Sequence, residues 1–122
     1  MTNDTDTDYP RVVIDDERTH AKGGIHLRSS KAALNWLGEH KDAHIGELWL
    51  DHDLSGDDTI RPVVLYLEER CFAGSPVEIG IIYVHTGSHP GAKWIMSSNL
   101  LREHYAVVRK SISDNFISQE VP

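Results

Sequence analysis

The sequence contains one cysteine, no long apolar run and no cluster of basic residues, and each of these absences excludes a class of protein. Cys71 has no partner for an internal disulfide, so the core must stabilise the fold, which fits a reducing cytoplasm. No segment is apolar enough over ~20 residues to span a bilayer, and no basic, apolar leader is present. We therefore expect a cytoplasmic protein that does not associate with membranes.

Basic residues are also outnumbered, with 12 Lys and Arg against 19 Asp and Glu, which gives a net charge of -7. Binding to duplex nucleic acid depends on neutralising phosphates, so this balance argues against a duplex-binding surface. It does not exclude a phosphate-bearing substrate, because a bound divalent cation can invert the local field.

The length of 122 residues fits a single domain with one core. We expect a flexible acidic tail over residues 1–9, an α/β domain over residues 10–112, and a C-terminal tail or short helix over residues 113–122.

Short apolar segments alternate with amphipathic ones along the domain. The pattern predicts strands at 11–14, 25–28, 47–50, 77–84 and 104–109, and helices from 29 or 30 to 37, at 59–72 and from 90 to 101. Segment 15–24 is polar and ends in two glycines, so little or no helix is expected there. Strands that alternate with helices predict a parallel sheet whose carboxyl ends share one edge, where ligands bind.

Titratable residues follow three of the predicted strands. The first strand runs into Asp15 and Asp16, the third into Asp51, His52 and Asp53, and the fourth into His85 and Thr86. Buried strands do not normally end in such groups, because burying charge is costly. We therefore expect one functional site at this edge of the sheet.

The carboxylates predict a metal site at Asp15, Asp16 and Asp51. Neighbouring strands lie about 4.8 Å apart, so these groups would repel one another unless a cation held them ionised. Oxygen ligands favour Mg²⁺ or Mn²⁺ over zinc. The alternative is that Asp51 and Asp53 only cap the following loop.

His85 is either a proton carrier that faces this cluster or a structural histidine. Arg18 is placed either to hold a phosphate or to neutralise the aspartates. The hydroxyl of Thr86 and the backbone amides around Ser88 and Gly91 are candidate phosphate ligands. His40 and His44 have helical metal-ligand spacing, but we expect them at the surface near a helix end.

Three motifs resemble those of the cyclic-phosphate processing receiver-like domains: IDDER (14–18), LDHDL (50–54), and VHT with a following PG (84–91). The resemblance covers roughly residues 11–96. It implies the flavodoxin-like fold of response-regulator receivers, with a mostly parallel five-stranded sheet in the order 2-1-3-4-5. The first helix of that fold would be short or absent here.

The resemblance also implies that Asp15, Asp16 and Asp51 correspond to the Mg²⁺-binding acidic pocket of receivers. Thr86 would match their hydroxyl residue, and Lys110 is the candidate for their lysine. His52, Asp53 and His85 are additions that a phosphoacceptor receiver does not need, which favours an enzyme.

Two functions follow from these motifs. The first is a metal-dependent phosphoesterase that acts on a cyclic phosphate in an RNA terminus or a small molecule. In it, His85 and His52 are the base and the acid, Asp53 belongs to the catalytic group, and Arg18, Thr86, Ser88 and Gly91 bind the substrate. The second is a noncatalytic receiver-like module that binds a phosphorylated ligand or protein. Oligomeric state is left open.

Overall fold

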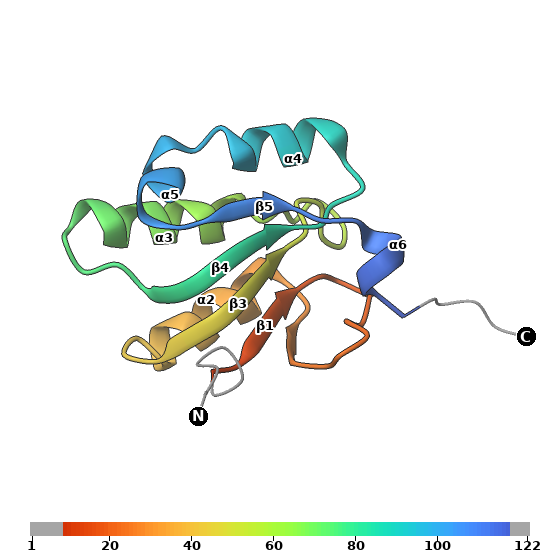
Figure 1. Cartoon of the computed structure of the whole chain (residues 1–122), viewed down its shortest axis with the longest axis horizontal. Coiled ribbons are helices and arrows are strands. Elements are labelled where there is room, and N and C mark those ends of the chain that lie inside the picture. Colours follow the sequence, from red (N-terminus) through yellow and green to blue (C-terminus); the bar gives the residue numbers. More distant parts are fainter. Residues whose placement is uncertain (1–8, 118–122) are drawn as a thin grey trace, which may run out of the picture.

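A five-stranded parallel sheet forms the centre of the computed structural model, which describes residues 9–117 (Figure 1). The strand order is β2-β1-β3-β4-β5. The receiver-like fold predicted from the sequence is therefore confirmed, including the lack of a helix between the first two strands. The strands are β1 (Arg11–Ile14), β2 (Ile25–Leu27), β3 (His44–Leu50), β4 (Glu78–Val84) and β5 (Val107–Arg109).

Three of the described helices are capped at their N-termini by the side chain of a serine. Ser29 caps α2, and Ser88 and Ser98 cap α4 and α5 through their side-chain oxygens. Because Ser98 starts a new helix, the single helix predicted to run through residue 101 is in fact two. The helices are α2 (Ser30–Glu39), α3 (Arg61–Phe72), α4 (His89–Met96), α5 (Asn99–His104) and α6 (Ile112–Asn115).

Two predicted boundaries were wrong. His44 is the first residue of β3 and stacks on Tyr9, so it does not lie at a frayed helix end. His104 ends α5, and the last strand begins only at Val107. The conformation of each stretch depends on neighbours distant in sequence, which the local pattern does not contain.

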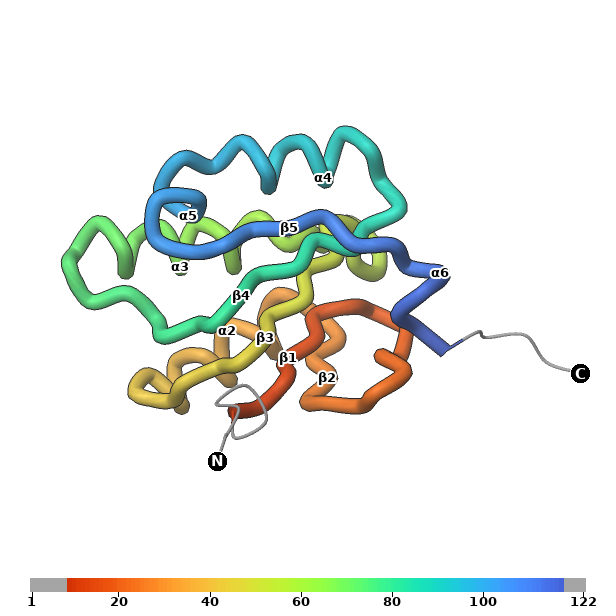
Figure 2. Tube along the Cα trace, in the orientation of Figure 1, coloured from red at the N-terminus to blue at the C-terminus, as the bar shows by residue number. Residues whose placement is uncertain are grey.

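The main core lies between the sheet and the helices α2 and α3, which run behind the sheet in Figure 2. From the apolar positions of the helices and strands, the sequence predicts six core residues: Trp36, Leu37, Leu50, Val64, Leu67 and Ile82. Of these, Trp36 is only partly buried, although it packs against the core. The others are buried: Leu37, Leu50, Val64, Leu67 and Ile82.

A smaller cluster covers the opposite face of the sheet. Val13 and Trp49 pack there against Phe116, which is 8% exposed, and Ile112 of α6 joins them. The described part of the predicted C-terminal tail is therefore packed on the domain. The predicted N-terminal tail lies, apart from Tyr9, outside the described residues. No helix in the described part is long and apolar enough to cross a membrane.

Candidate active site

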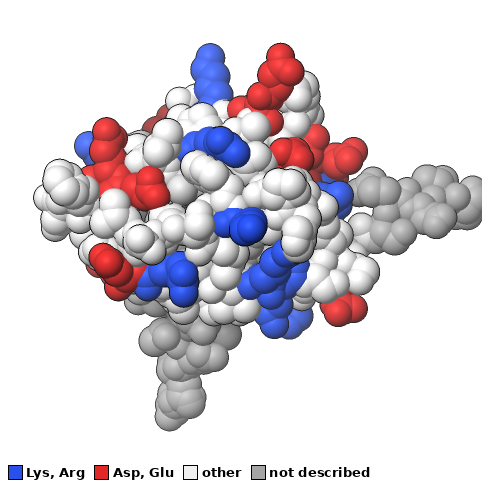
Figure 3. Space-filling model, turned by 90° about the horizontal axis from the view of Figure 1, so that it is seen from above, with Lys and Arg blue, Asp and Glu red and all other residues white. Residues whose placement is uncertain are grey.

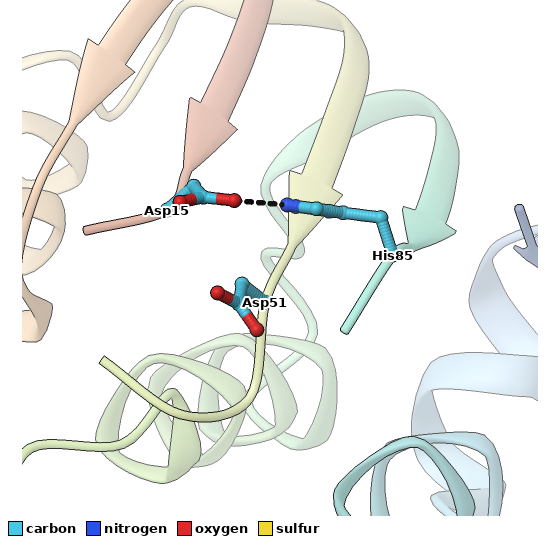
Figure 4. A group of neighbouring side chains, drawn as sticks. All are labelled: Asp15, Asp51 and His85. Carbon is cyan, nitrogen blue, oxygen red and sulfur yellow. Dashed lines mark hydrogen bonds and ion pairs between the residues drawn. The ribbon is translucent and has the colours of Figure 1, made fainter. Parts of the chain in front are cut away.

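The parallel register brings three titratable residues to one place. Ile14 pairs with Leu50, and Leu50 pairs with Val84, so the residues that follow these three strand ends are neighbours. They are Asp15, Asp51 and His85, whose candidate ligand atoms all lie within 4.8 Å of one another (Figure 4). All three are buried.

Asp15 is held by an unusually complete set of donors. Its Oδ1 accepts hydrogen bonds from the backbone N–H groups of Glu17 (2.9 Å) and Arg18 (2.7 Å), and its Oδ2 accepts from Nε2 of His85 (3.0 Å). Burial alone would raise the pKa of Asp15, but these bonds more than offset it and hold the pKa below its usual value. Asp15 is therefore an anion fixed in orientation.

Asp51 is in the opposite situation. It is 3% exposed, and burial raises its pKa, with the negative charge of Asp15 acting in the same direction. A hydrogen bond from Thr86 and the charge of Arg18 only partly compensate. A Nη1 nitrogen of Arg18 lies 3.3 Å from Oδ2 of Asp15 and 3.4 Å from Oδ2 of Asp51, so this cation bridges the two carboxylates.

The donor set fits a divalent cation, although it is not the predicted set. Asp16 does not join the compact group, because its Oδ2 accepts a hydrogen bond from Ser55 at 3.0 Å. His85 takes its place beside Asp15 and Asp51. Two carboxylates and one imidazole are ordinary ligands of Mn²⁺ and similar ions, and the raised pKa of Asp51 reflects a charge that a cation would relieve.

A cleft of about 380 Å³ opens beside this group, and Asp51 is the member of the group that lines it. That size suits one small ligand. Of the predicted substrate-binding residues, Arg18 and Ser88 line the cleft, whereas Thr86 and Gly91 are buried beside it. The described residues that line it are Asp16, Glu17, Arg18, Asp51, Asp53, Leu54, Gly87 and Ser88.

The comparisons with known proteins agree with this geometry. The family model described as the cyclic-phosphate processing receiver domain matches residues 10–100, which is most of the chain. The chain belongs to this family. No curated protein and no solved structure gave a significant match.

In this receiver domain, the two ring nitrogens of His52 bind Arg61 and Asp53, and neither binds Asp15 or Asp51. Nε of Arg61 donates to its Nε2 at 3.1 Å, so the ring proton is on Nδ1, which donates to Oδ1 of Asp53 at 2.7 Å. A side chain at Gly91 would lie 2.5 Å from Cγ of His52, so glycine is needed there for close packing. His52 thus holds Asp53, whose side chain is 63% exposed, at the rim of the cleft.

Neither His85 nor Lys110 lines the cleft. The ring of His85 is fully buried and stacks on Phe116 at 4.5 Å, and its Nδ1 has no hydrogen-bond partner among the described residues. Nζ of Lys110 lies 5.7 Å from the ring centre of Tyr83 and lines a different pocket from the acidic cleft. Arg18 is the cation that the described residues place at the acidic group.

Two supporting residues were not predicted from the sequence. Arg61 fixes the tautomer of His52, and Phe116 supports the ring of His85. The contact between Arg61 and His52 could not be predicted, because a basic residue in the first turn of a helix is too common to indicate a particular partner. The contact between His85 and Phe116 joins residues 31 positions apart, so no local sequence pattern indicates it.

Proposed function

We propose that this domain hydrolyses a cyclic phosphate to a phosphate monoester, with a divalent cation bound by Asp15, Asp51 and His85. The observation that carries the proposal is the convergence of these three side chains beside an open cleft that Asp51 lines. Family membership supports the choice of a cyclic phosphate, and both an RNA terminus and a small molecule are candidate carriers of it.

Mn²⁺ fits the donor set better than Mg²⁺, because an imidazole nitrogen is a poor ligand for Mg²⁺. When bound, the cation would supply Lewis-acid stabilisation of phosphate charge. Arg18 lies between the two carboxylates at the floor of the cleft, where its guanidinium can also donate to a nonbridging phosphate oxygen. Ser88 lines the cleft and is the second polar contact proposed for the phosphate.

Asp53 is the proposed general base, because it lies in the cleft while His52 faces Arg61 and His85 is fully buried. The Asp53 carboxylate takes a proton from the attacking water as the water oxygen forms a bond to phosphorus. One ring P–O bond then breaks, and its oxygen receives the proton from Asp53. His52 acts through Asp53. His85 acts as a ligand, for which its Nε2 would give up the proton that it donates to Asp15 when no ion is bound.

A role as a phosphoacceptor receiver is less well supported. Such a receiver places a lysine at the acidic site, whereas Lys110 lies over Tyr83. The arrangement around His52 and Asp53 would also have no evident use in a module that only binds.

The proposal is tested by incubating the protein with 2′,3′-cyclic and 3′,5′-cyclic nucleotides, with Mn²⁺, with Mg²⁺ or with a chelator. Phosphorus NMR distinguishes the cyclic diester from the monoester product. We expect metal-dependent ring opening of at least one compound, and its loss in Asp51→Asn. Ring opening that persists in the chelator, or in this variant, would refute the proposed site.

A further inference from the structure

We infer that the substrate of this site is a small, singly charged cyclic phosphate that carries free hydroxyl groups, and not the end of an RNA chain. This inference rests on the function proposed above and narrows it. It depends on the charges, hydrogen-bonding groups and side-chain types that line the cleft.

Negative charge surrounds the reacting position. Four carboxylates line the cleft, and the cation that lines it, Arg18, already bridges Asp15 and Asp51. A divalent ion at the floor would offset the charges of Asp15 and Asp51, but it would leave those of Asp16, Glu17 and Asp53 at the rim. A cyclic phosphate carries a single negative charge, which can bind to the cations at the floor of the cleft. The additional phosphates of an RNA chain would have to pass these rim carboxylates, which repel them.

The rim carboxylates are suited to a different part of a substrate. Ionised carboxylates only accept hydrogen bonds, and a hydroxyl group is the donor that a sugar or polyol offers. Asp16 is held in place by the 3.0 Å hydrogen bond that its Oδ2 accepts from Ser55, so its carboxylate is already oriented before a ligand binds. The cleft can therefore select a hydroxylated carrier through the same residues that repel additional phosphate.

The cleft also lacks a surface on which a base would stack. None of its described lining residues is aromatic. Proteins that hold single-stranded nucleic acid combine a basic groove with aromatic side chains under successive bases. Figure 3 shows one face of the molecule, on which Lys and Arg side chains lie along the middle and Asp and Glu lie mainly to either side of them.

The test compares uridine 2′,3′-cyclic phosphate with a short RNA that ends in the same cyclic group. The reacting atoms are identical, and the compounds differ only in the chain behind them. At low ionic strength kcat/KM should favour the mononucleotide by at least about tenfold. The ratio should fall toward one at high salt, because added ions screen exposed charges.

Glu17→Gln should reduce the preference at low salt, because it removes one rim charge. Glu39→Gln is the matched control: it removes the same charge at the exposed end of α2, which precedes β3 and lies away from the cleft, so the ratio should not change. Equal kcat/KM values at low salt, or a preference for the RNA, would overturn this inference while leaving the proposed function intact. Cleavage of neither compound with Mn²⁺ or Mg²⁺ present would overturn this inference, and the proposed function would be overturned as well if the 3′,5′-cyclic nucleotides also stayed intact.

Discussion

Nε2 of His85 donates a 3.0 Å hydrogen bond to Oδ2 of Asp15, and this contact joins the end of β4 to the end of β1 across the intervening strand β3. The two residues are 70 positions apart, and neither is exposed. A buried ionised carboxylate is stable only when it is paired and hydrogen-bonded, and His85 supplies part of that pairing. The same geometry leaves Asp51 nearby with an unfavourable charge, which is the basis for the proposed metal site.

Adding Mn²⁺ should raise the melting temperature, because a ligand that binds only the folded state stabilises it by mass action. The stabilisation should reach about 2.7 kcal/mol when free metal is roughly 100 times Kd. Asp51→Asn should abolish most of this increase in a thermal titration. Asp42→Asn is the control, because Asp42 is exposed in the turn before β3. An equal response in Asp51→Asn and the parent would place the metal elsewhere.

His20 should make the fold sensitive to mild acid. It is 3% exposed, and burial, together with the charge of Arg11, lowers its pKa from 6.5 to about 4. As the pH falls through this window, the unfolded chain binds a proton that the folded chain does not, so stability is lost. The loss should approach about 3 kcal/mol near pH 4.

Urea unfolding at a series of pH values measures this effect. His20→Phe keeps an aromatic ring against Trp49 and Phe116 but cannot bind the proton. Its stability should therefore change less between pH 6.5 and 4 than that of the parent. Parallel curves for the two proteins would show that another group is responsible.

His52→Leu should affect both stability and catalysis. It removes the bonds to Arg61 and Asp53, and losing partly buried hydrogen bonds of this kind costs about 1–3 kcal/mol. If Asp53 is the base, kcat of the folded protein should also fall, while the Kd for Mn²⁺ stays the same. A loss of stability with normal kcat would assign His52 a purely structural role.

The fold was predictable because its signals are local and repeated. Apolar strands alternate with amphipathic segments, and the polar stretch between Asp15 and Gly24 has neither pattern, so the parallel sheet and the missing first helix both followed. The order of the strands came from the resemblance to receiver-like domains. The division of the last long helix at Ser98 was missed, since a serine inside an apolar pattern is a common residue in helices as well as a cap.

The convergence of the strand-end residues at the candidate site was also predictable, because right-handed crossovers place all strand ends on one edge. The roles of the individual residues within the candidate site were less predictable. Asp15 and Asp16 are adjacent and chemically identical, yet one is buried with His85 and the other binds Ser55. That difference depends on where the chain turns after β1, which no motif specifies. The direction of His52 depends in the same way on Arg61 in the next helix.

The most direct test of the account is the rate of cyclic-phosphate ring opening as a function of Mn²⁺ concentration, measured in the parent and in His85→Phe. The substitution keeps a ring against Phe116 and removes both nitrogens. The account predicts saturable activation in the parent, and in the variant a requirement for at least about tenfold more Mn²⁺, because a ligand is lost. Identical activation curves for the two folded proteins, or no activation by metal in the parent, would contradict it.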